Sequence, residues 1–137
     1  MRKALFLLSC FVAAVFLQGC GSPDSPRDVA EKSLGYLKDK QFDKYVDLLY
    51  FEEEISGDKD LLKEKKESMQ ELMQNKYNMS VQERGAIKEF KFLNEEVQDS
   101  TAVVKMEVSF SSGKVDTQKV RLKKLPNGNW KVDPKGK

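Results

Sequence analysis

The spacing of apolar residues changes near the middle of the chain. Between residues 26 and 77 apolar side chains recur every three or four positions, as on one side of an α-helix. From Gly85 onward they alternate with polar ones, most clearly from Val104 to Phe110, as on a strand buried on one face. The pattern predicts an α+β fold in which N-terminal helices precede an antiparallel sheet.

Two short helices are predicted first. Ser25 before Pro26 is typical of a helix start, because Ser caps free backbone N–H groups and Pro suits the first helical position. The period breaks at residues 38–40, so we expect a helical hairpin. Its apolar faces are Val29, Ala30, Ser33, Leu34 and Leu37 on the first helix, then Phe42, Tyr45, Val46 and Leu49 on the second.

A longer helix is predicted from about Asp60 to Tyr77, after an acidic loop at 52–54 and a turn at 56–58. Charged residues between the apolar positions form a solvated face, and the apolar repeat is too short for a coiled coil. The expected buried side consists of Leu62, Met69, Leu72, Met73 and Tyr77.

Four strands are predicted in the second half, at 87–93, 104–110, 114–124 and 129–132. A turn at 111–113 separates the middle two, and Asn127-Gly128 supplies the positive-φ residues of a tight hairpin. We therefore expect a four-stranded antiparallel meander, curved around the helices.

The N-terminus has a different pattern, in which Arg2 and Lys3 precede an apolar run over residues 4–17. This order is typical of a secretory signal peptide. As a helix the run would span only about 21 Å, short of the roughly 30 Å hydrocarbon layer. We expect removal of the segment rather than a retained membrane span.

The run ends in Leu17-Gln18-Gly19-Cys20, which resembles the lipobox of bacterial lipoproteins. The resemblance implies cleavage between Gly19 and Cys20, and acylation of the Cys20 thiol and amine. An ordinary signal peptide followed by a chance cysteine is the alternative. The expected organisation is a signal peptide at 1–19, a lipidated cysteine and tether at 20–25, and a single domain at 26–137.

Acylation of Cys20 would place the protein outside the cytoplasm, held to a bacterial membrane by its acyl chains. Gly21 stands where enterobacterial lipoproteins retained in the inner membrane have aspartate, which favours an outer-membrane or cell-surface location. Loss of residues 1–19 removes Cys10, so no intramolecular disulfide is expected. Cleavage also removes Arg2 and Lys3, two of the 24 basic residues, and leaves as many basic as acidic residues, 22 of each. This neutral balance gives no indication of nucleic-acid binding.

Several segments together resemble a known family: Ser25-Pro26, residues 41–44, Ile87-Lys88, residues 102–104 and residues 127–132. They are similar to small bacterial lipoproteins that carry domain of unknown function 4878. The resemblance implies a nuclear-transport-factor-2-like or cystatin-like cone, in which the curved sheet wraps a helix. It implies no particular activity.

Little catalytic chemistry is expected from the composition. The chain has no histidine, and its glycines at 57, 85, 113 and 128 stand alone at turns rather than in a phosphate-binding loop. The adjacent acids at 52–54 and 95–96 lack the spacing of a calcium loop. We therefore expect no catalytic residue, metal or cofactor.

Two residue groups leave alternatives open. Tyr45, Phe90, Phe110 and Trp130 either fill the core or line an apolar pocket inside the cone. Lys119, Arg121 and Lys123 alternate along one strand, as expected of a solvent-facing surface or of a face for an anionic partner.

The expected function is a non-enzymatic binding or interaction module in the cell envelope, whose partner is an unknown protein or a small apolar ligand. The alternative is an apolar carrier, or an enzyme that pairs a carboxylate with one of the tyrosines at 36, 45, 50 and 77. A dimer through the exposed sheet face is a third hypothesis, since the sequence leaves the oligomeric state open.

Overall fold

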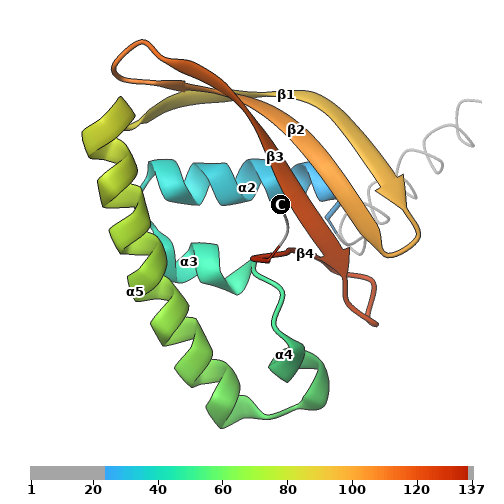
Figure 1. The fold of residues 1–137 in the computed structure, drawn as a ribbon. Coiled ribbons are helices and arrows are strands. Elements are labelled where there is room, and N and C mark those ends of the chain that lie inside the picture. The colour runs from blue at the N-terminus through green and yellow to red at the C-terminus, as the bar shows by residue number, and fades with distance from the viewer. Residues whose placement is uncertain (1–23, 136–137) are drawn as a thin grey trace, which may run out of the picture.

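The computed structural model describes residues 24–135, so the predicted signal peptide and the Gly19–Cys20 cleavage and lipidation site lie outside the described residues. Helices precede strands, and the strands form one antiparallel sheet (Figure 1), which confirms the predicted α+β class. The helices are α2 (Pro26–Lys38), α3 (Phe42–Asp47), α4 (Glu52–Ser56) and α5 (Lys59–Arg84), and the strands are β1 (Ile87–Gln98), β2 (Thr101–Phe110), β3 (Val115–Lys124) and β4 (Trp130–Val132).

The strands follow one another in the order β1-β2-β3-β4, as a meander requires. Residues 48–50 run beside β4 in parallel, where the Tyr50 N–H donates to the Val132 carbonyl at 2.7 Å and the Val132 N–H donates to the Leu48 carbonyl at 2.7 Å. This segment covers the β4 edge of the sheet. At the opposite edge, no other strand within residues 24–135 pairs with the outer side of β1.

Helix α2 lies across the concave side of the curved sheet (Figure 1). Its start is a capping box, because the Ser25 hydroxyl accepts from the Asp28 N–H at 3.2 Å while the Asp28 carboxylate accepts from the Ser25 N–H at 3.1 Å. Val29, Ala30 and Leu34 are buried against the sheet. The predicted helix start at Ser25-Pro26 is confirmed.

The core is formed between the concave side of the sheet and the helices. Val104, Met106 and Val108 on β2 are fully buried, which confirms the predicted inner face of this strand. Among residues 24–135, the buried core residues run from Val29 to Val132. They come from both the helices and the strands and form one continuous hydrophobic cluster.

The structure corrects three boundaries. Residues 52–54, expected in a loop, open α4, because three glutamates favour a helix N-terminus and Gly57 ends the helix at φ +83°. Helix α5 continues to Arg84 rather than Tyr77, until Gly85 breaks it. Strand β1 reaches Gln98 and β2 begins at Thr101, since a tight turn joins them at 99–100.

Candidate functional site

Three of the aromatics that were candidates for a pocket lie in the core. Tyr45, Phe110 and Trp130 are at most 9% exposed, and Phe90 is half-buried against them. Burial raises the pKa of Tyr45 to about 12, so its hydroxyl is harder to ionise than that of an exposed tyrosine. Phe110 also borders a shallow surface depression beside Arg84 and Asp116. The structure does not bring the four residues together around a common cavity.

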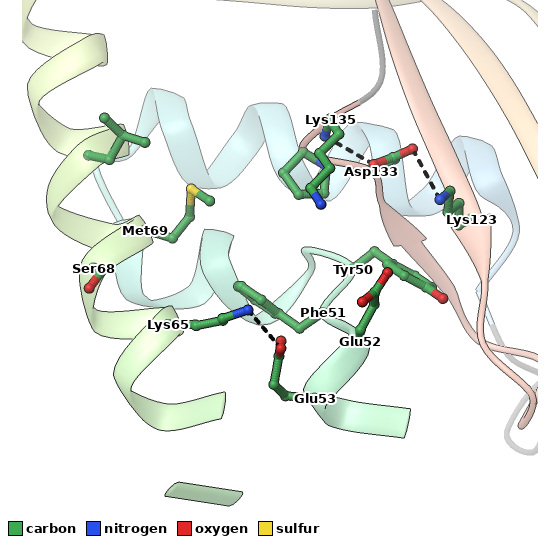
Figure 2. A pocket seen from close by; sticks show the side chains of 12 residues that line it. Tyr50, Phe51, Glu52, Glu53, Lys65, Ser68, Met69, Lys123, Asp133 and Lys135 are labelled. Atoms are coloured by element: carbon green, nitrogen blue, oxygen red, sulfur yellow. Dashed lines mark hydrogen bonds and ion pairs between the residues drawn. The ribbon is translucent and has the colours of Figure 1, made fainter. Parts of the chain in front are cut away.

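A different cavity lies between α4, the first half of α5 and the C-terminal segment (Figure 2). This α4–α5 pocket has a volume of about 400 Å³, within the range of sites that hold small molecules. It is lined by Tyr50, Phe51, Glu52, Glu53, Lys65, Ser68, Met69, Leu72, Lys123, Asp133, Pro134 and Lys135.

The apolar part of the pocket comes from two elements. Phe51, just before α4, is buried, while Met69 and Leu72 come from α5. Leu72 was expected on the buried side of the third helix, but it is 45% exposed. The reason is that Leu72 lies to one side of the stripe of Met69, Met73 and Tyr77 that packs against the core, and it borders the pocket instead. Of the other expected positions, Tyr77 is buried, and Leu62, Met69 and Met73 are half-buried against the core.

Ion pairs line the rim of the pocket. Lys65 Nζ donates to Glu53 Oε2 at 2.7 Å, and Lys123 Nζ lies 3.9 Å from Asp133 Oδ2. The hydrogen bond from Lys65 lowers the pKa of Glu53, and the same bond raises the pKa of Lys65. The Lys123 ammonium also lies 5.2 Å from the centre of the Tyr50 ring. The charged side chains at the opening therefore form two ion pairs, Glu53 with Lys65 and Asp133 with Lys123.

This arrangement limits the chemistry of the pocket. A carboxylate with a lowered pKa is a weak proton acceptor at neutral pH, so Glu53 is poorly suited to general-base catalysis. Among residues 24–135, no three acidic, cysteine or histidine side chains gather closely enough to hold a metal ion. What the pocket offers is apolar contact surface below a rim of paired charges.

The sequence indicated the pocket only weakly. Its lining residues come from positions 50–53, 65–72, 123 and 133–135, which are distant in the chain. The sequence pattern predicts a solvated loop for the acidic run at 52–54 and a buried position for Leu72. The one local signal is the pair Tyr50-Phe51 immediately before the glutamates, two aromatics that no predicted element accounted for.

A sheet of four antiparallel strands curved around N-terminal helices defines a fold of the NTF2-like class. The crystal structure of the "Putative NTF2-like transpeptidase" from Campylobacter jejuni is similar, with a TM-score of 0.64, 16% sequence identity, and coverage of 82% of this chain and 100% of that chain. At this identity the similarity shows the fold alone.

The chain belongs to the family described as Domain of unknown function (DUF4878), whose family model matches residues 18–133. The predicted domain family and the predicted fold are thereby confirmed. No curated protein matches the chain. Within residues 24–135, none of the helices combines the length and apolarity needed to span a bilayer.

Proposed function

We propose that this protein is a lipid-anchored module of the bacterial cell envelope, and that its α4–α5 pocket binds a small apolar or amphipathic molecule without changing it chemically. The observation that carries this proposal is the apolar wall of the pocket, in which buried Phe51, half-buried Met69 and exposed Leu72 lie beside a rim of ion pairs.

An apolar ligand gains free energy by covering that surface. Complete burial of a leucine side chain is worth about 1.5–3 kcal/mol relative to exposure, and Leu72 is 45% exposed. The rim charges neutralise one another in pairs, so the pocket does not require an ionic ligand. A polar group at one end of the ligand would reach the rim near Lys135 or Glu52, whose side chains also line the opening (Figure 2).

The arrangement of the tyrosines supports binding rather than catalysis. An acid–tyrosine enzyme needs a desolvated carboxylate opposite a tyrosine hydroxyl. In the α4–α5 pocket the tyrosine is Tyr50, whose ring lies beneath the Lys123 ammonium, while Glu53 is held in its charged form by Lys65. Tyr77 is buried and accepts a hydrogen bond from the Ile87 N–H at 3.3 Å.

The anchoring part of the proposal rests on Leu17, Gly19 and Cys20. Only a few residues separate Cys20 from the cap of α2 at Ser25, and a flexible tether of that length reaches about 12 Å. The membrane, contacted through the acyl chains on Cys20, is therefore one partner of the protein. Gly21 favours the outer membrane or the cell surface.

Fluorescence of the neutral apolar dye N-phenyl-1-naphthylamine tests the binding part. Residues 21–137 contain the buried cluster from Val29 to Val132 and no cysteine, and are suitable for the titration. We expect saturable binding that Leu72→Asp weakens at least tenfold, because a carboxylate would be placed against the dye. Met79→Asp is the matched control, since Met79 lies on the same helix, is 63% exposed and is not part of the pocket.

Equal affinities of the two variants, or an absence of saturable binding, would exclude the α4–α5 pocket as the ligand site. Mass spectrometry of molecules recovered after incubation addresses the absence of catalysis. A candidate ligand that bound and was returned with an altered mass would contradict a purely binding role.

A further inference from the structure

The outer edge of β1 is the longest unpaired stretch of backbone in the described sheet. The strand has 12 residues, from Ile87 to Gln98, and pairs only with β2 within residues 24–135. Such an edge presents N–H and C=O groups that can accept another strand. On the opposite side residues 48–50 cover β4, and within residues 24–135 only the start of β3, residues 115–121, lacks a strand partner there, a shorter stretch than β1.

A β-bulge divides this edge. Phe92 lies opposite Met106 and Asn94 opposite Lys105, so β1 has one additional residue at Leu93. Before the bulge the inner-face positions are 90 and 92, and after it they are 95 and 97. The even and odd positions thus exchange faces, and Lys91 and Glu96 both lie on the outer face of the sheet.

We propose that two copies of this protein pair antiparallel through β1, around a two-fold axis between Leu93 and Asn94. In this register Lys91 lies opposite the partner's Glu96, and Phe90 lies opposite the partner's Val97. Residues directly opposite each other in an antiparallel pair lie on the same face of the sheet. Positions 91 and 96 differ by an odd number, which would place them on opposite faces of a regular strand, but the additional residue at the bulge brings both to the outer face. The two sheets then form one continuous sheet, with both sets of helices on the same side.

Charge complementarity supports a second copy as the occupant of this edge. Two-fold symmetry makes the Lys91–Glu96 pair occur twice. The Lys91 side chain is 69% exposed and lies 3.7 Å from Glu107, an outer-face neighbour on β2, which leaves the ammonium open to a second carboxylate. Opposite charges directly across an antiparallel pair are stabilising.

Two exposed apolar residues lie on the same edge. Leu93 is 41% exposed and Val97 is 51% exposed, although both belong to the sheet. In the proposed dimer Leu93 lies at the axis and Val97 packs beside the half-buried ring of the partner's Phe90. Pairing therefore removes apolar surface from water at both positions.

Shorter registers use less of the strand. Pairing centred on Phe90 would oppose Lys91 and the partner's Glu89, but it would use only the residues before the bulge. Pairing centred on Glu96 would place two like charges opposite each other, which is unfavourable. The register around residues 93 and 94 is the one that uses both halves of β1.

Disulfide trapping tests this register directly, using residues 21–137, which contain no cysteine. In the variant Lys91→Cys/Glu96→Cys, each cysteine lies across from a cysteine of the partner at a cross-strand Cβ distance of about 4.5–5.5 Å. Within one chain the two cysteines are about 16 Å apart. We expect mild oxidation to produce a covalent dimer, seen on a non-reducing gel.

The single variants Lys91→Cys and Glu96→Cys are matched controls. In the proposed dimer, each one's two cysteines lie about 16 Å apart, so both should remain largely monomeric. A double variant that forms no more covalent dimer than the single variants would overturn the proposal.

Charge exchange provides a test without new cysteines. Sedimentation should show that Lys91→Glu shifts the equilibrium at least tenfold toward monomer, and that Lys91→Glu/Glu96→Lys restores the dimer. Lys105→Glu, on the outer face of β2, should leave the equilibrium unchanged. Recovery by Glu89→Lys instead of Glu96→Lys, or a loss of dimer in Lys105→Glu alone, would reject this register.

Discussion

The carboxylate of Glu53 on α4 accepts a hydrogen bond at 2.7 Å from the ammonium of Lys65 on α5. Helix α4 has five residues and none of them is buried, so its position depends on a few contacts with α5 and the adjoining segment, and on the Glu54–Lys131 ion pair to β4 at 3.8 Å. The Glu53–Lys65 pair therefore fixes one wall of the α4–α5 pocket, and its loss should change the pocket more than the core.

Replacement of Lys65 by methionine should release α4. The amides of residues 53–57 are expected to exchange hydrogen faster, while the amides of β2 keep their protection, because the core does not involve this pair. Lys63→Met is the control, since Lys63 lies on the same helix and outside the pocket. Unchanged exchange in α4 would show that other contacts hold it in place.

The same contact should depend on pH at both ends of the range. The pKa of Glu53 is lowered by folding. Its contribution to the stability of α4 is therefore complete above the unfolded pKa of 4.5 and is lost as the pH falls through the lower folded pKa. The pKa of Lys65 is raised by folding. Its contribution to the stability of α4 is therefore complete below the unfolded pKa of 10.5 and is lost as the pH rises through the higher folded pKa. Exchange rates of α4 amides, compared between wild type and Lys65→Met, should differ between these limits and converge outside them.

Gly85 should tolerate no side chain. It has φ +89° and ψ 175°, a conformation that only glycine adopts readily, and an added Cβ would lie 2.9 Å from the Ser112 nitrogen. We expect Gly85→Ala to lower the free energy of unfolding by about 3 kcal/mol or more. Gly57→Ala should cost only about 1–2 kcal/mol, because Gly57 is left-handed but has open space around it. Urea unfolding of both variants measures the difference.

Tyr77 should carry most of the attachment of α5 to the core. Its ring centre lies 5.8 Å from that of Phe42, and its hydroxyl accepts from the Ile87 N–H. We expect losses of about 1 kcal/mol for Tyr77→Phe and about 3–5 kcal/mol for Tyr77→Ala in urea unfolding. Leu72→Ala should stay within about 0.5 kcal/mol, since Leu72 is largely exposed. A larger loss at Leu72 than at Tyr77 would contradict this division of α5.

Cys20→Ser should abolish membrane attachment, because it removes the thiol that the proposed anchor requires. The full-length precursor is expected to keep its signal peptide and to incorporate no labelled fatty acid, because serine has no thiol to accept the lipid. Cys10→Ser is the matched control and should be processed normally, since Cys10 lies within the predicted signal peptide. A Cys20→Ser protein that is still cleaved and membrane-bound would refute the anchor.

Much of the fold could be predicted because its determinants are local. The cap at Ser25, the alternation from Val104 to Phe110 and the Asn127-Gly128 turn each depend on residues within a few positions of one another. In the structure the Asn129 N–H donates to the Asn127 side chain at 2.9 Å, and Gly128 has φ +92°. Backbone preferences and hydrophobic period are sufficient for such features.

The tertiary structure decided what local patterns leave undetermined. Leu72 follows the helical period, yet it is exposed, because a residue is buried only where another element covers it. The α4–α5 pocket exists because residues 133–135 return beside Tyr50, and the bulge at Leu93 appears only in the register between β1 and β2. The sequence by itself determined most of the helices and strands, α4 excepted, and which face of each is apolar. The surfaces available to a ligand or a second copy arise from contacts between distant segments, which no local period encodes.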